Sequence, residues 1–104
     1  MENGFELLDP SNARAFLKRF SAEDKRSGNF CYQRGCVGDF HVDEPGVAYR
    51  TAVVEADENF DVRLSYDAVE GWQGDCSCEL DRCQHQYAAM RALLAEHGLR
   101  SCGT

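Results

Sequence analysis

Four metal-ligating side chains lie within ten residues of this chain, and they constrain its fold more than any other feature. They are Cys76, Cys78, Cys83 and His85, in the stretch CSCELDRCQH. Three thiolates and one imidazole are a standard donor set of a tetrahedral structural zinc site. Buried cysteines without a ligand role are the alternative, but the residues between these donors are mostly polar or charged. The pattern therefore predicts one zinc ion with a closed donor set, which is structural and not catalytic.

The spacing of the four donors fits a turn between a strand and a helix. In extended backbone, residues two apart point to the same side, so Cys76 and Cys78 can direct both sulfur atoms at one ion. In a helix the same pair would lie about 200° apart around the axis. We therefore expect Cys83 in the turn before a helix and His85 in its first turn, where free N–H groups favour a thiolate. The four residues between Cys78 and Cys83 let the chain double back over the metal.

Length and composition predict a single α+β domain, residues 1–104. Of its 104 residues, 43% are hydrophobic and 28% are charged, as in ordinary folded domains. We expect a helical part over residues 1–36, a sheet with the zinc site over residues 37–98, and a tail over residues 99–104. No apolar run is long enough to cross a membrane, and the N-terminal residues do not resemble a secretion signal. A cytoplasmic, reducing setting is therefore expected.

Two helices are predicted before the sheet. The first begins at Pro10, a residue suited to the first helical position. The second opens with Ser21 as its cap, and it weakens at Gly28 or stops at Gly35. Phe30 and Tyr32 are predicted to supply its core contacts. The apolar side chains of the first helix recur at helical spacing and are Ala13, Phe16, Leu17 and Phe20.

Three antiparallel strands are predicted after these helices. Residues 37–42 are the weakest candidate, and residues 47–55 are rich in β-branched side chains. Residues 60–66 alternate between apolar and polar side chains without interruption, as a strand with one buried face does. A loop that holds Trp72 then leads to the cysteines, and a last helix is expected to end at Gly98.

The donor spacing resembles that of the SWIM-type zinc finger. Cys76-x-Cys78, a four-residue spacer and Cys83-x-His85 match the Cys-x-Cys…Cys-x-His pattern of that family. The strands before the donors and the alanine-rich helix after them are also similar, so the resemblance covers residues 47–95. It implies a zinc-stabilised module that contacts proteins or DNA, for example as the accessory part of a bacterial Swi/Snf-like helicase.

Two details of the resemblance concern the partner. Residues 28–37 are similar, more loosely, to the region upstream of the finger in bacterial members. Family members often carry Lys or Arg beside the second ligand pair, whereas this chain has Gln84 and Gln86. The resemblance therefore implies contact with a protein or an adjoining domain more than direct contact with nucleic acid.

The charge distribution also bears on the partner. Residues 1–36 hold six basic and five acidic residues, whereas residues 37–104 hold five basic and thirteen acidic ones. An acidic chain is repelled by phosphates unless its basic residues gather on one face. Neither a membrane nor a small-molecule substrate is expected as a partner. A direct DNA-binding role, the alternative, would use a basic face made of Arg14, Lys18, Arg19, Lys25, Arg26 and Arg34.

The remaining cysteines allow two further hypotheses. Cys31, Cys36, His41 and Cys102 could form a second metal site, but their spacing fits no established ligand pattern. Cys31 and Cys36 could instead be a redox pair, although they do not form a Cys-x-x-Cys motif.

Thiol-based catalysis is the enzyme hypothesis for this chain. It would use Cys83 as the nucleophile and His85 as the base, yet the zinc site already requires both side chains. The sequence contains neither a Walker-type loop nor a His-Glu-x-x-His helix. We therefore expect a binding protein and not an enzyme.

Overall fold

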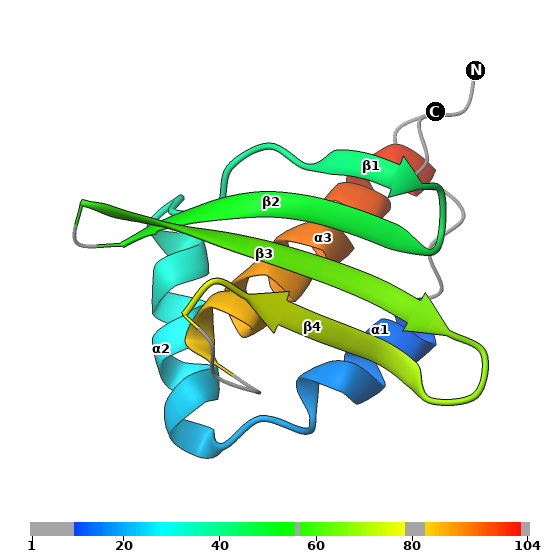
Figure 1. Ribbon diagram of the computed structural model, residues 1–104, viewed down its shortest axis with the longest axis horizontal. Helices are drawn as coiled ribbons and strands as arrows, with labels where there is room; N and C mark the ends of the chain where they lie inside the picture. Colours follow the sequence, from blue (N-terminus) through cyan, green and yellow to red (C-terminus); the bar gives the residue numbers. More distant parts are fainter. Residues whose placement is uncertain (1–9, 56, 79–82, 103–104) are drawn as a thin grey trace.

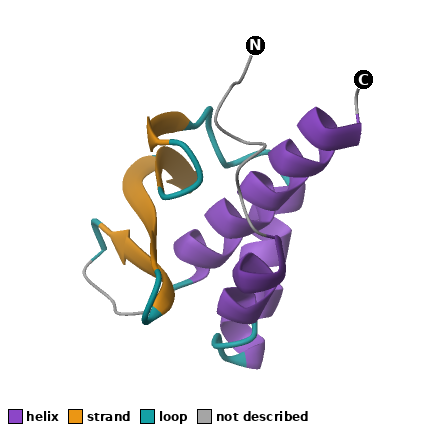
Figure 2. Ribbon diagram, turned by 90° about the vertical axis from the view of Figure 1, so that its right-hand side faces the viewer, coloured by secondary structure: helices purple, strands orange, loops and turns teal. Residues whose placement is uncertain are grey.

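A computed structural model of the protein describes residues 10–55, 57–78 and 83–102, except for the side chains of residues 98–102. The described helices and strands form two layers, with the sheet on one side and the helices on the other (Figures 1 and 2). The predicted α+β class is confirmed. In chain order the elements are α1 (Pro10–Leu17), α2 (Ala22–Gln33), β1 (His41–Glu44), β2 (Ala48–Glu55), β3 (Glu58–Asp67), β4 (Gly71–Cys76) and α3 (Gln84–Cys102).

The sheet is an antiparallel meander with the strand order β1-β2-β3-β4. β4 pairs with β3 along its whole length, from Gly71 opposite Asp67 to Cys76 opposite Val62. The prediction of three strands, with a loop around Trp72, is therefore wrong. Trp72 and Cys76 point into the core, as alternating residues of a strand do. The pattern is hard to recognise in the sequence because β4 also contains two glycines and an aspartate, which are uncommon residue types in strands.

The first strand is also displaced from its predicted position. β1 begins at His41, whereas residues 37–42 were expected to form this strand. Val37 forms only an isolated bridge with Val53 of β2. The segment nevertheless lies along the sheet, because Gly38 N–H donates to Ala52 O at 2.8 Å.

The last helix continues past the glycine that was expected to end it. α3 extends through Gly98 to Cys102, so the predicted stop is wrong. A single glycine costs a helix only about 1 kcal/mol relative to alanine, which a helix of 19 residues tolerates. Residues 99–102 of the predicted tail are therefore helical, and residues 103–104 lie outside the described part of the chain.

The second helix has the predicted ends but a different buried face. Ser21 Oγ accepts a hydrogen bond from Asp24 N–H at 3.1 Å, as a cap does. The helix ends before Gly35, which has a φ of +76°. Phe30, a predicted core residue, is 60% exposed, so that prediction is wrong.

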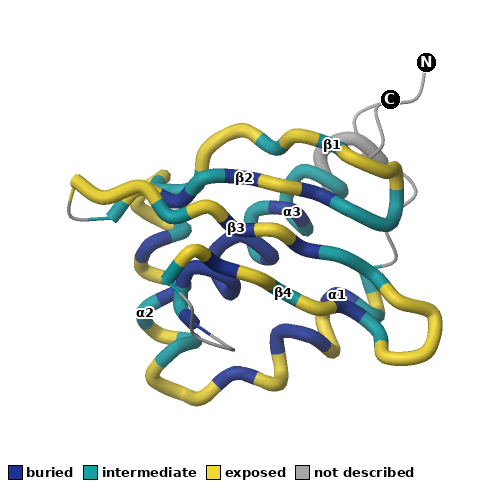
Figure 3. The backbone as a smooth tube through the Cα atoms, in the orientation of Figure 1, coloured by how far each residue is buried: buried dark blue, intermediate teal, exposed yellow. Residues whose placement is uncertain are grey.

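The core lies between the inner face of the sheet and the helices. Figure 3 shows buried residues spaced along β2, β3 and β4 and along α3 behind them. Phe20, which follows α1, packs edge-on against both Phe16 and Tyr87, with ring centroids 5.1 and 5.5 Å away. Burying a large apolar side chain contributes about 1.5–3 kcal/mol. The largest fully buried apolar side chains are Trp72, Tyr49, Leu64, Met90, Leu93, Val53 and Val62.

Gly28 lets α2 pack closely against the start of α3. A Cβ at this position would lie 2.7 Å from Tyr87 Cδ1 and 3.0 Å from Gln84 O. Gly28→Ala should cost about 1–3 kcal/mol through overpacking and regain about 1 kcal/mol of helix propensity. We therefore expect chemical denaturation to give a free energy of unfolding about 1 kcal/mol lower than that of the parent protein. Gln33→Ala, at an exposed site of the same helix, is the control, and a Gly28→Ala protein more stable than the parent would contradict this packing.

Candidate metal centre

The four donors predicted from the sequence converge at one end of the sheet. Cys76 is the last residue of β4, Cys83 directly precedes α3, and His85 is the second residue of that helix. Their ligand atoms and that of Cys78 all lie within 4.8 Å of one another. Cys78 is half-buried and the other three are buried. Residues 79–82, where the chain was predicted to double back, lie outside the described residues.

The distance between Cys76 and His85 fits a tetrahedral zinc ion. Zn–S bonds of about 2.3 Å and Zn–N bonds of about 2.0 Å place neighbouring ligand atoms about 3.5–3.8 Å apart. Cys76 Sγ lies 3.7 Å from His85 Nδ1. Thiolate and imidazole are also the donors that zinc favours over carboxylate oxygen. The Cys₃His group is therefore positioned to bind one metal ion.

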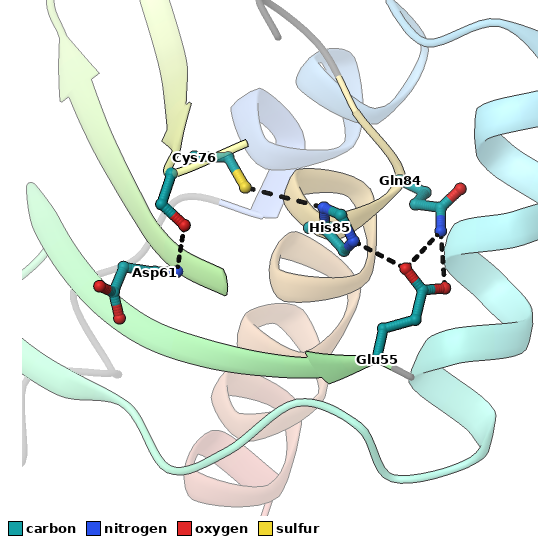
Figure 4. A network of polar contacts seen from close by, with 6 residues as sticks. Glu55, Asp61, Cys76, Gln84 and His85 are labelled. Atoms are coloured by element: carbon teal, nitrogen blue, oxygen red, sulfur yellow. Dashed lines mark hydrogen bonds and ion pairs between the residues drawn. The ribbon is translucent and has the colours of Figure 1, made fainter. Parts of the chain in front are cut away.

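Glu55, at the end of β2, determines which ring nitrogen of His85 faces the cysteines. His85 Nε2 lies 2.8 Å from Glu55 Oε1, while Nδ1 points at the sulfur of Cys76 (Figure 4). A carboxylate only accepts, so Nε2 carries the proton and Nδ1 offers its lone pair to a metal. Gln84 Nε2 holds the same carboxylate, at 2.8 and 2.7 Å from its two oxygens. A carboxylate on the distal nitrogen is the usual partner of a zinc-bound histidine.

Phe60 of β3 covers the face of the same imidazole. The two rings stack with centroids 4.0 Å apart and an interplanar angle of 15°. Neither Phe60 nor Glu55 was predicted from the sequence to belong to the site. The position of Glu55 could have indicated this role. Alternate residues of a strand point to the same face, and Glu55 lies on the face of β2 that carries the buried Tyr49 and Val53. A carboxylate on the buried face of a strand requires a partner.

Backbone contacts support the cysteine segment at the end of β4. Ser77 pairs with Asp61 of β3 twice, because Ser77 N–H donates to Asp61 O and Asp61 N–H donates to Ser77 Oγ, each at 3.0 Å. Cys76 Sγ accepts a backbone hydrogen bond from Cys78. The main chain around the first two donors is therefore held in place by β3.

The buried Cys76 and Cys83 thiols favour their protonated form when no cation is present. Burial raises the pKa of Cys76 and of Cys83, and it outweighs the backbone hydrogen bond that Cys83 receives from Gln86. A divalent cation reverses this balance, because a coordinating thiol gives up its proton. Buried neutral thiols are otherwise inert as nucleophiles.

The six basic residues of the predicted interaction face all belong to the helical layer. The structure gives two of them contacts within the molecule. Arg19 donates to the backbone oxygens of Trp72 and Glu70, at 3.1 and 3.3 Å, and so ties the end of α1 to β4. The guanidinium of Arg34 lies 5.3 Å from the ring centroid of the exposed Phe30. The remaining four are Arg14 on α1, Lys18 directly after α1, and Lys25 and Arg26 on α2.

The second metal site considered from the sequence does not form among the described side chains. The His41 side chain is 68% exposed and lies 3.5 Å from Asp43, and it belongs to no described cluster of three or more potential ligands. The Cys102 side chain lies outside the described part of the chain. The Cys₃His cluster is the one potential metal-binding group of three or more ligands that the described residues contain.

Comparisons with family models, with curated proteins and with solved structures find no match to this chain. The chemistry of the site therefore follows from its own residues: four convergent donors, a carboxylate behind the histidine and a stacked aromatic ring. No helix among the described residues combines the length and the apolar composition that crossing a bilayer requires.

Replacing the Glu55 carboxylate should weaken metal binding. Glu55→Gln removes the negative charge behind His85, and loss of such a partner typically lowers metal affinity about 10–100-fold. The measurement is competition for zinc with a chromophoric chelator. Glu58→Gln is the matched control, because Glu58 faces Glu55 across the strand pair but is exposed. Equal zinc affinity of the two variants would show that Glu55 has no such role.

Proposed function

We propose that this protein is a zinc-stabilised interaction module of the SWIM type. The observation that carries the proposal is the convergence of Cys76, Cys78, Cys83 and His85 at a strand–turn–helix junction. The spacing of these donors is the feature that resembles the family. The zinc ion in this proposal has a structural role, and the module contacts another protein or an adjoining domain.

Two features favour a structural ion over a catalytic one, and a third argues against a reactive thiol. The protein itself supplies four donors, so no coordination position stays open for a substrate. Three of the four donors are buried. Burial also raises the pKa of Cys83, whereas an activated nucleophile requires a lowered one. The same features argue against Cys83 and His85 as a thiol-based catalytic pair.

Loss of one ligand should unfold the C-terminal half of the domain. Structural zinc in small fingers contributes on the order of 10 kcal/mol of apparent binding free energy, comparable with the whole stability of a domain. Cys78→Ser, or a chelator, should therefore lower the helical circular dichroism signal and the melting temperature. Cys36→Ser removes a thiol outside the cluster and should not alter zinc content. A melting curve that a strong chelator leaves unchanged would exclude a structural zinc.

The charges of the described residues are divided between the two layers. The helical layer, residues 10–36 and 84–97, contains seven basic and three acidic residues, a net charge of +4. The sheet layer, residues 37–78, contains two basic and ten acidic residues, a net charge of −8. Its outer face has a hollow of about 590 Å³ whose charged lining is Asp39, Asp61 and Asp75 together with Arg50 and Arg63. This acidic layer supports contact with a basic protein surface, because it repels phosphates.

Direct DNA binding is the second candidate, and the basic helical layer is the observation that favours it. Arg14, Lys18 and Arg26 are exposed there, and the exposed Phe30 offers a ring on which a base could stack. In this candidate the helical layer faces the nucleic acid and the acidic sheet layer faces solvent.

A titration across salt concentration distinguishes the two partners. The proposal of a protein partner predicts little affinity for labelled single- or double-stranded DNA at any salt concentration, measured by fluorescence anisotropy. DNA binding through the helical layer would instead show a log–log salt slope of about −0.9 per phosphate contact on duplex DNA. The triple variant Arg14→Glu/Lys18→Glu/Arg26→Glu would then abolish binding. Arg63→Glu in the sheet layer, the control, would not.

A further inference from the structure

Two cysteines outside the metal centre meet at the C-terminus of α2. Cys31 belongs to the last turn of the helix and is 3% exposed, and Cys36, which follows the turn, is half-buried. Cys36 N–H donates to Cys31 O at 3.2 Å, and Gly35 N–H donates to Tyr32 O at 3.1 Å. These are the two hydrogen bonds of a Schellman motif, which commonly brings the side chains at its two ends into contact. The Schellman geometry thus places the two side chains next to each other, and the Cys36 side chain contributes to the raised pKa of Cys31.

The main chain on both sides of this contact is fixed. Cys31 is held by the helix, and Cys36 O accepts a hydrogen bond from Val54 N–H of β2 at 2.9 Å. Val37 then bridges to Val53 of the same strand. A bond between the two sulfur atoms would therefore join two residues whose main chains are already hydrogen-bonded to each other.

We propose that Cys31 and Cys36 are a redox-active dithiol that forms a disulfide with small-molecule disulfides such as glutathione disulfide. The pair is separate from the Cys₃His cluster, to which neither residue belongs. The Cys-x-x-Cys spacing of common redox motifs is absent, but the Schellman motif supplies the proximity that this spacing would otherwise provide.

The reaction has two exchange steps. Cys36, the more exposed thiol, loses its proton and attacks one sulfur of glutathione disulfide. This step forms a Cys36–glutathione mixed disulfide and releases one glutathione thiolate, which takes up the proton. Cys31 then attacks the Cys36 sulfur, loses its proton and releases the second glutathione. The dithiol and one glutathione disulfide thus become one protein disulfide and two glutathione thiols.

The two thiols differ in a way that sets this order. Burial, and after it the contact with Cys36, raises the pKa of Cys31 to about 12, so Cys31 reacts slowly with reagents in solution. Its attack on Cys36 is intramolecular, and the high effective concentration of such a neighbour compensates for a low thiolate fraction.

Peptide mapping by mass spectrometry tests the proposal on the full chain. The protein is equilibrated with glutathione and glutathione disulfide at several ratios, quenched by alkylation and digested, and its zinc content is measured in parallel. We expect a Cys31–Cys36 disulfide at oxidising ratios, with unchanged metal content. Recovery of both residues as alkylated thiols at every ratio would overturn the proposal. Zinc content is a separate readout, so a metal-free protein that forms this disulfide would contradict only the proposed function.

Single variants separate the two steps. Cys31→Ala keeps a small apolar side chain in the buried position and should trap a stable glutathione adduct at Cys36. Cys36→Ser should leave Cys31 as a free thiol, without an adduct. Cys102→Ser, the control, should form the Cys31–Cys36 disulfide as the parent does. Absence of a trapped adduct in Cys31→Ala, or an adduct at Cys31 in Cys36→Ser, would contradict the proposed order.

Discussion

The imidazole of His85 joins the two layers of the molecule. It belongs to the first turn of α3, its Nδ1 faces Cys76 of β4, its Nε2 meets Glu55 of β2, and Phe60 of β3 covers its ring. An unpaired buried donor would cost about 1–3 kcal/mol, so Glu55 satisfies the ring while directing its lone pair at the sulfur atoms. A metal ion bound there would link β4 to the start of α3 and thereby close the sheet onto the helix.

The five described cysteines occupy two different environments. Cys76, Cys78 and Cys83 surround one point together with an imidazole, which is the arrangement of a metal site. Cys31 and Cys36 lie next to each other at a helix end, which is the arrangement of a dithiol. The two groups thus suit different chemistry, because four donors favour a cation and two adjacent thiols favour a disulfide. The separation of basic residues in the helical layer from acidic residues in the sheet layer is independent of both cysteine groups. It bears on which kind of partner the protein contacts.

The metal donors could be predicted because all four lie within ten residues, so their residue types and spacing are visible in one short stretch of sequence. Glu55 and Phe60 reach His85 through strand pairing and helix packing, which spacing does not encode. The strand that contains Trp72 was missed because glycine and aspartate interrupt its pattern. Helical spacing also misplaced Phe30, since the close contact of α2 with α3 occurs at Gly28 and leaves Phe30 in solvent. Tertiary packing, and not local propensity, decided each of these cases.

X-ray absorption at the zinc edge of the purified protein tests the central claim most directly. The account predicts one zinc per chain, with three sulfur neighbours at about 2.3 Å and one nitrogen at about 2.0 Å. A first coordination sphere dominated by oxygen, or a purified protein that is fully ordered without any metal, would contradict it.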